Sequence, residues 1–127
     1  MPDGERMRFL VVDDSSTMRR IIINTLNKLG HHEVAEAANG REAMDRLAAL
    51  GRVDMVLTDW NMPEMTGIEF VKALRGHDAF KHIPVLMVTT NAVQDEVAEA
   101  LKAGVNNYVV KPFTPDTIRE KIEAAMC

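Results

Sequence analysis

The sequence predicts a doubly wound α/β fold, in which a five-stranded parallel sheet carries five helices on its two faces. Apolar segments of strand length alternate with segments of helical period along the 127 residues, and the connections between them are short. This alternation is typical of a parallel sheet, because each strand is followed by a helix that returns the chain to the same end of the sheet. Right-handed crossovers with helices on both faces allow the strand order 2-1-3-4-5. We therefore expect a single domain over residues 1–127.

The composition of each predicted strand indicates its place in the sheet. Continuously apolar runs indicate central strands, because helices cover both of their faces. Strands that mix apolar with polar residues suit the edges of the sheet. In chain order the predicted strands are 8–12 (central), 33–37 (edge), 55–58 (central), 85–89 (central) and 107–110 (edge).

The predicted helices begin at side chains that can cap a helix, and glycines end the first four of them. The capping residues in chain order are Ser15 or Ser16, Asn39, Thr66 and Thr114, and Thr114 precedes Pro115, which a first turn tolerates. The fourth helix runs from about residue 92 to 103. The glycines that end the first four helices are Gly30, Gly51, Gly76 and Gly104.

The composition indicates a globular protein and excludes several classes. Hydrophobic residues make up 46% of the chain, yet no apolar run approaches the roughly 20 residues that span a bilayer. The net charge of −4 argues against a surface for duplex nucleic acid, which is normally basic. The single cysteine, Cys127, excludes a disulfide framework within one chain. Residues 1–8 are polar and no signal-peptide core follows them, so we expect a cytoplasmic protein that binds neither nucleic acid nor membrane.

Polar side chains follow four of the predicted strands at the point where each strand ends. Asp13 and Asp14 follow the first strand, Asp59 the third, Thr89 ends the fourth, and Lys111 follows the fifth. In doubly wound sheets ligands bind outside the carboxyl ends of the strands. We therefore expect three carboxylates, a hydroxyl and an ammonium group to converge at one edge of the sheet.

This set of side chains suits a magnesium ion and a phosphoryl group. Neighbouring carboxylates repel one another unless a cation lies among them, and Mg²⁺ prefers carboxylate, water and phosphate oxygens. A carboxylate beside Mg²⁺ can attack phosphorus and form an acyl phosphate. Phosphoryl transfer then needs mainly charge neutralisation and positioning, which Lys111 and Thr89 could supply.

Each of these residues also has a purely structural interpretation. Asp13 or Asp14 could cap the first helix, and Asp59 could be a turn residue. Thr89 could be an ordinary strand residue, and Lys111 could be a solvated strand end. Capping alone seldom places complementary chemistry at four strand ends, so we favour the functional interpretation.

Four segments carry a resemblance to a known family. They read FLVVDDSSTMRR at 9–20, TDWNMPEMTG at 58–67, PVLMVTT at 84–90 and YVVKPFT at 108–114. With these segments the sequence resembles, from about residue 8 to 125, the receiver domains of two-component response regulators. It is most similar to those of the CheY type, which act in chemotaxis. The resemblance implies the flavodoxin-like form of the fold.

The resemblance also implies roles for residues at the strand ends. Asp59 would accept a phosphoryl group from a histidine kinase and contact Mg²⁺. Asp14 would bind Mg²⁺ directly, Asp13 would bind it through water, and Asn61 would add its backbone carbonyl. Lys111 would contact the phosphoryl group and precede a cis peptide bond, which an X–Pro bond allows at low energetic cost.

A switch and an output surface are implied in the same way. Thr89 would bond the phosphoryl group and move inward, and Tyr108 would turn inward with it. Phe113 and Lys121 belong to the family's output surface, which the fourth helix, the fifth strand and the fifth helix form. In this family that surface binds the flagellar motor switch. A phosphoryl group adds about −1.5 to −2 charges, enough to bias a two-state loop.

The sequence departs from the family's pattern after the fourth strand. Thr90 and Asn91 stand where the best-known chemotaxis regulators have Ala and Glu, and residues 92–94 replace a segment that usually carries two lysines. The expected phosphorylation site is unaffected, whereas details of the motor surface and any helper phosphatase stay open. Asn61 and Asn91 flank the expected position of an attacking water, so we hypothesise that they set the rate of self-dephosphorylation.

Three other functions are compatible with the fold. An Asp-nucleophile phosphatase would usually carry a second Asp where Asn61 stands. A flavin carrier would need a phosphate loop where Asp13 and Asp14 would repel phosphate. An interaction module that is never phosphorylated would not need the full set of strand-end residues. We expect a monomer that is not an enzyme and that catalyses only its own phosphorylation and dephosphorylation. We also expect it to signal through a protein partner, because the chain ends after the fifth helix without an effector domain.

Two local features complete the predictions. His31 and His32 follow Gly30, and we expect them to form an exposed turn without companion metal ligands. Trp60 lies beside Asp59, and we expect it near the surface, where it could report on the site by fluorescence.

Overall fold

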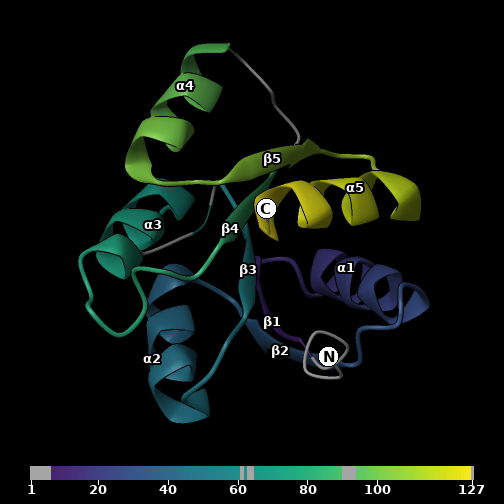
Figure 1. Ribbon diagram of the computed structural model, residues 1–127, viewed down its shortest axis with the longest axis horizontal. Helices are drawn as coiled ribbons and strands as arrows, with labels where there is room; N and C mark the ends of the chain where they lie inside the picture. Colours follow the sequence, from purple (N-terminus) through teal and green to yellow (C-terminus); the bar gives the residue numbers. More distant parts are fainter. Residues whose placement is uncertain (1–6, 61, 63–64, 90–93, 127) are drawn as a thin grey trace.

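Five parallel strands form one sheet in the computed structural model, which describes residues 7–60, 62, 65–89 and 94–126, without the side chains of 94–97 and 126 (Figure 1). The sheet has the order β2-β1-β3-β4-β5, and each neighbouring pair is parallel. The predicted fold class and strand order are therefore confirmed. The strands are β1 (Arg8–Val12), β2 (Glu33–Ala37), β3 (Met55–Asp59), β4 (Val85–Thr89) and β5 (Asn107–Val110).

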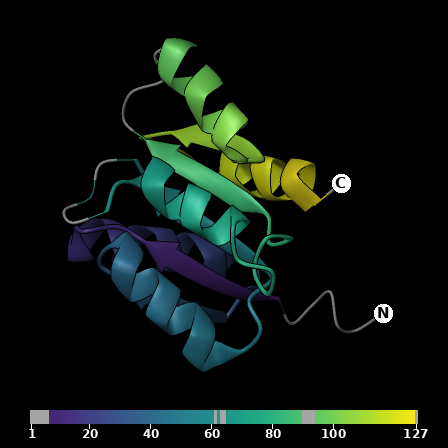
Figure 2. The same cartoon turned by 90° about the vertical axis from the view of Figure 1, so that its left-hand side faces the viewer.

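Helices cover both faces of this sheet, as Figures 1 and 2 show. On one face lie α1 and α5, and on the other lie α2, α3 and α4. None of the helices in the described part of the chain is long and apolar enough to cross a membrane. The helices are α1 (Ser16–Lys28), α2 (Gly40–Leu50), α3 (Gly67–Arg75), α4 (Gln94–Ala103) and α5 (Pro115–Met126).

The core consists of two apolar layers separated by the sheet, because successive side chains of a strand point to opposite faces. In β1, Leu10 and Val12 pack with the helices α2, α3 and α4, whereas Phe9 and Val11 pack with α1 and α5. All four side chains are almost completely buried. The continuous apolar run of this strand is thus explained by burial on both faces.

The helix boundaries largely follow the predicted caps. Ser15, not Ser16, caps α1, and its hydroxyl accepts a hydrogen bond from the Met18 N–H at 3.2 Å. Thr66 caps α3 in a reciprocal capping box with Glu69. The predicted start of α4 at residue 92 lies outside the described residues. Among the predicted glycine stops, Gly30, Gly51 and Gly104 have φ of 94°, 77° and 113°, whereas Gly76 has φ of −82° and needs no left-handed backbone.

The turn after α1 differs from the expectation at His31. Its N–H donates to the Leu26 carbonyl at 2.9 Å, and its ring centroid lies 4.8 Å from that of Phe9. Within the described residues its Nδ1 is a buried nitrogen without a hydrogen-bond partner. Burial lowers the pKa of His31, and the neighbouring His32 lowers it further. The prediction of an exposed turn is right for His32 and wrong for His31, because the left-handed Gly30 reverses the chain over Phe9.

Arg75, at the end of α3, joins segments that lie far apart in the sequence. Its guanidinium donates five hydrogen bonds, two of them to the Gly104 carbonyl at 3.1 and 2.7 Å. The others go to the carbonyls of Lys81 and Ile83 and to the side-chain oxygen of Asn106. One side chain therefore holds the end of α4 against the loop that enters β4, at the amino ends of the strands.

Candidate functional site

The carboxyl ends of the strands bring the predicted acidic residues together. Asp13 follows β1, and Asp59 is the last residue of the adjacent strand β3. One carboxylate oxygen from each of Asp13, Asp14 and Asp59 lies within 4.8 Å of the other two. Asp13 is buried, Asp59 is partly buried and Asp14 is exposed, so the cluster opens to solvent at Asp14.

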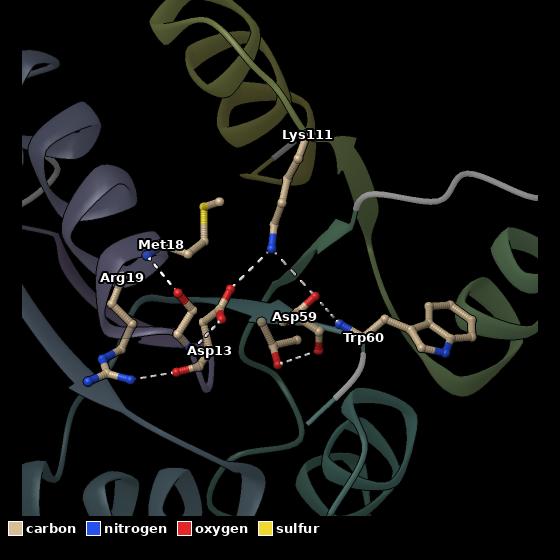
Figure 3. Close-up of polar contacts among 8 residues, drawn as sticks. Asp13, Met18, Arg19, Asp59, Trp60 and Lys111 are labelled. Carbon is tan, nitrogen blue, oxygen red and sulfur yellow. Dashed lines mark hydrogen bonds and ion pairs between the residues drawn. The ribbon is translucent and has the colours of Figure 1, made fainter. Parts of the chain in front are cut away.

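Lys111 points from the end of β5 into this cluster (Figure 3). Its Nζ lies 3.2 Å from Asp13 Oδ2 and 3.6 Å from Asp59 Oδ1, and its side chain is only 9% exposed. One ammonium group thus bridges two carboxylates, and three carboxylates with one lysine leave an excess of negative charge. Such an excess favours a bound cation.

Backbone groups orient two of the carboxylates. The Ser15 N–H donates to Asp13 Oδ1 at 2.9 Å, and the Trp60 N–H donates to Asp59 Oδ1 at 2.8 Å. Ser15 caps α1, so the alternative that Asp13 or Asp14 caps this helix is wrong. The carboxylate of Asp13 instead accepts bonds from Ser15 and Lys111.

The electrostatic environment raises the pKa of Asp59 above its ordinary value of 3.8. Burial is the largest cause, since it disfavours the ionised form. Lys111 opposes this effect, Asp13 adds to it, the Trp60 N–H opposes it, and Asp14 adds to it. A cation among the carboxylates would favour the ionised form that a nucleophile needs.

The donor atoms of the cluster fit a hard divalent cation. Three carboxylates supply oxygen ligands without a thiolate or an imidazole among them, which is the ligand type that Mg²⁺ takes together with waters and phosphate. The backbone carbonyl predicted as a further ligand belongs to Asn61, which lies outside the described residues.

Thr89 ends β4 beside the cluster. It is 5% exposed, and its carbonyl oxygen accepts a hydrogen bond of 2.7 Å from the Lys111 N–H. The ends of β4 and β5 are therefore joined next to the site. The Lys111–Pro112 peptide bond is cis, as expected. Thr90 and Asn91 lie outside the described residues.

The residues predicted for the output surface fall into two places. Tyr108 is partly buried against the layer of α2, α3 and α4, and Lys121 Nζ lies 5.2 Å from the centroid of its ring. That geometry is a cation–π contact between β5 and α5. Phe113 packs against the layer of α1 and α5, on the face of the sheet opposite to the layer that Tyr108 packs against.

Arg19 is a residue of the site that the sequence reasoning missed. Its Nη1 donates to the Asp13 carbonyl oxygen at 2.7 Å (Figure 3). Its Nε donates to Glu36 Oε1 at 2.7 Å. A basic residue in the first turn after the cap was the only signal in the sequence. No helical or strand period links that residue to the carbonyl of Asp13.

Comparison with known proteins identifies the family and agrees with the fold. The response regulator receiver domain family matches residues 9–123. The chain is 55% identical over 120 residues to chemotaxis protein CheY1 of Helicobacter pylori, which covers 94% of this chain and 97% of that protein. It is 57% identical over 117 residues to the CheY homologue of Campylobacter jejuni, which covers 92% of this chain and 90% of that protein.

A solved structure shows the same architecture. Chemotaxis protein CheY4 of Vibrio cholerae superposes with a TM-score of 0.87 at 38% identity, over 94% of this chain and 98% of that chain. Sequence and structural similarity thus extend over nearly the whole length of both proteins. The chain belongs to the response regulator receiver domain family and, within it, to the CheY group.

Proposed function

We propose that this chain is a chemotaxis response regulator that accepts a phosphoryl group on Asp59 in a Mg²⁺-dependent reaction. The observation that carries the proposal is the cluster in which Lys111 bridges Asp13 and Asp59 while the carboxylate of Asp14 faces solvent. This arrangement pairs a partly buried nucleophile with a fixed positive charge and an open, oxygen-lined cation site.

In the proposed reaction a carboxylate oxygen of Asp59 attacks the phosphorus of a phosphohistidine on a histidine kinase. The new O–P bond gives an acyl phosphate, and the P–N bond breaks so that its electron pair returns to the histidine. Mg²⁺, held by Asp13, Asp14, Asp59 and the Asn61 carbonyl, would neutralise charge on the phosphoryl oxygens. Lys111 neutralises a further part of that charge.

The hydrogen bonds and ion pairs of the site position these groups before the phosphoryl donor arrives. The Trp60 N–H holds one Asp59 oxygen, and the short contacts of Lys111 place its ammonium group between two strand ends. A preformed arrangement reduces the reorganisation that phosphoryl transfer requires. Self-dephosphorylation would use water in place of the histidine, so the protein changes its own state and is not an enzyme acting on other substrates.

For the output we propose the surface of α4, β5 and α5. Phosphorylation would draw Thr89 toward the phosphoryl group and change the packing around Tyr108, whose ring Lys121 contacts. Phe113 and Lys121 would contribute to the partner contact. The relationship to the CheY proteins supports the flagellar motor switch as the partner. The same proposal has residues 1–127 acting as one monomeric receiver domain in the cytoplasm, with a helper phosphatase as a candidate partner for dephosphorylation.

Intact-protein mass spectrometry after incubation with acetyl phosphate tests the acceptor. The wild type should gain one phosphoryl group only when Mg²⁺ is present, and Asp59→Asn should gain none. Asp45→Asn, at an exposed position of α2, is the matched control and should behave like the wild type. Folded wild-type protein that gains no phosphoryl group under any condition would refute the proposal and favour an interaction module that is never phosphorylated.

A further inference from the structure

We propose that Arg19 is a positioning residue for the magnesium site, because it fixes the peptide group that joins Asp13 to Asp14. This inference rests on the proposed Mg²⁺-dependent function and extends it to a side chain outside the cluster. It assigns Arg19 no contact with the ion or with the phosphoryl group.

The contacts of Arg19 define a clamp between α1, β2 and the loop after β1. Nη1 donates to the Asp13 carbonyl oxygen and Nε donates to Glu36 Oε1, each at 2.7 Å. These distances are at the short end of the range for charge-assisted hydrogen bonds, which are the stronger kind. The side chain of Arg19 is only 17% exposed, whereas that of Glu36 is 50% exposed. Arg19 is thus held in place on the protein surface by a partner on the neighbouring strand.

The atom that Arg19 binds determines how Asp14 leaves β1. The peptide group is planar, so fixing the Asp13 carbonyl oxygen also fixes the N–H and the Cα of Asp14. The preceding peptide group is held by the bond from the Asp13 N–H to the Ala37 carbonyl at 3.1 Å. The following turn is held by the bond from the Ser15 N–H to Asp13 Oδ1. Arg19 therefore holds the one peptide group that these two bonds leave free, the group that joins Asp13 to Asp14. Both residues are proposed to bind the ion.

The need for such a clamp follows from the exposure of Asp14. Its side chain is exposed, so packing does little to orient it. A carboxylate that must meet an ion of near-octahedral geometry needs its backbone held in one orientation. Groups that orient metal ligands without touching the metal typically change metal affinity by about 10- to 100-fold when they are removed.

The charge of Arg19 allows its positioning role to be separated from simple electrostatics. Removing a positive charge near a cation site should strengthen cation binding. Loss of the hydrogen bonds that Arg19 makes to Asp13 and Glu36 should weaken cation binding. The sign of the change therefore distinguishes the two effects, and Arg20 supplies the matched control, because it is an exposed neighbour of the same charge on the same helix.

The experiment is a Mg²⁺ titration of the wild type, Arg19→Met, Arg20→Met and Asp59→Asn, followed by amide NMR and by fluorescence of Trp60, the single tryptophan. We expect Arg19→Met to raise the dissociation constant for Mg²⁺ about tenfold, and Arg20→Met to leave it unchanged or lower it. Faster hydrogen exchange of the Ser15 amide in Arg19→Met alone would locate the change at the loop.

The outcomes separate the two proposals. If the wild type does not bind Mg²⁺, the proposed function and this inference both fail. If the wild type binds through Asp59 but Arg19→Met binds equally well or more tightly, the inference alone is overturned. Equal weakening in Arg19→Met and Arg20→Met overturns it as well. Should Arg19→Met not fold, Arg19→Lys, which keeps the charge but lacks the two-nitrogen fork, decides the matter: weaker binding supports the clamp and unchanged affinity overturns it.

Discussion

Replacing Asp59 by asparagine should stabilise the metal-free protein at neutral pH, although Asp59 is the proposed phosphoacceptor. The raised pKa means that the folded protein disfavours the ionised side chain, chiefly because of burial. Asparagine removes the charge but keeps an oxygen that can accept the Trp60 N–H. Lys111 keeps its shorter contact with Asp13, so the substitution leaves no unpaired ammonium group.

The size of the effect follows from the distances. With an effective dielectric constant of about 20, Lys111 at 3.6 Å attracts the Asp59 carboxylate by about 5 kcal/mol. A second carboxylate oxygen within 4.8 Å repels it by about 3 kcal/mol or more, and Asp13 repels it more strongly than the exposed Asp14. The charge terms nearly cancel, and the desolvation remains. Desolvation of a fully buried ion costs several kcal/mol, and Asp59 is only partly buried. We therefore expect Asp59→Asn to raise the free energy of unfolding by about 2 kcal/mol.

The gain should depend on pH with a definite sign. An acid whose pKa is raised by folding binds its proton more tightly in the folded state, so wild-type stability falls as pH rises from 3.8 through the raised pKa. The variant lacks this titration. Its advantage over the wild type should therefore be larger at neutral pH and shrink as the pH falls to and below 3.8, where the carboxyl group becomes neutral in both states.

Urea denaturation with a chelator present, followed by circular dichroism, measures the difference. At pH 7.5 the free energy of unfolding of the variant should exceed that of the wild type by about 2 kcal/mol, and at pH 4 by much less. Asp45→Asn should change stability by less than about 0.5 kcal/mol at either pH. A variant that is no more stable than the wild type at pH 7.5, or equally favoured at both pH values, would refute the reasoning.

Three further substitutions test the packing around the site and the core. Lys111→Met should destabilise the metal-free protein by about 3 kcal/mol in urea denaturation, because it leaves a buried carboxylate unpaired; a neutral effect would contradict the pairing. Gly67→Ala should lose about 2 kcal/mol, since a Cβ there would overlap the carbonyl oxygen of Asp59, whereas Gly76→Ala meets no atom nearer than 3.4 Å and should be tolerated; equal denaturation midpoints would count against this difference. Arg75→Met removes five hydrogen bonds and should lower the free energy of unfolding by about 3 kcal/mol, together with faster amide exchange at the end of α4; unchanged exchange there would show that Arg75 does not anchor this helix.

Much of the fold could be predicted because its signals are local. Apolar runs of four or five residues identified the strands, and their composition placed β2 and β5 at the edges, as the structure shows. The capping side chains of Asn39 and Thr66 accept bonds from residues three positions ahead. Such contacts depend on a few neighbouring residues, so the sequence carries them directly.

The gathering of the acidic residues could also be predicted, because parallel strands end at the same edge of a sheet. This rule places Lys111 near Asp13 although the two are 98 positions apart in the sequence. It says nothing of which carboxylate Lys111 approaches most closely or of which one becomes hardest to ionise. Those properties depend on burial and on distances of a few ångströms, which only the packed structure sets.

The sequence by itself thus determined the fold class and the carboxylates and lysine that meet at the strand ends, and it allowed the observed strand order. Only the tertiary structure decided that Arg19 binds the Asp13 carbonyl with Glu36 as its anchor, that Arg75 holds the end of α4, and that His31 is partly buried. Periodicity and capping act along one segment, and they select a segment's conformation and the face it buries. A long polar side chain, by contrast, can reach many partners, and its choice among them depends on how several segments pack together.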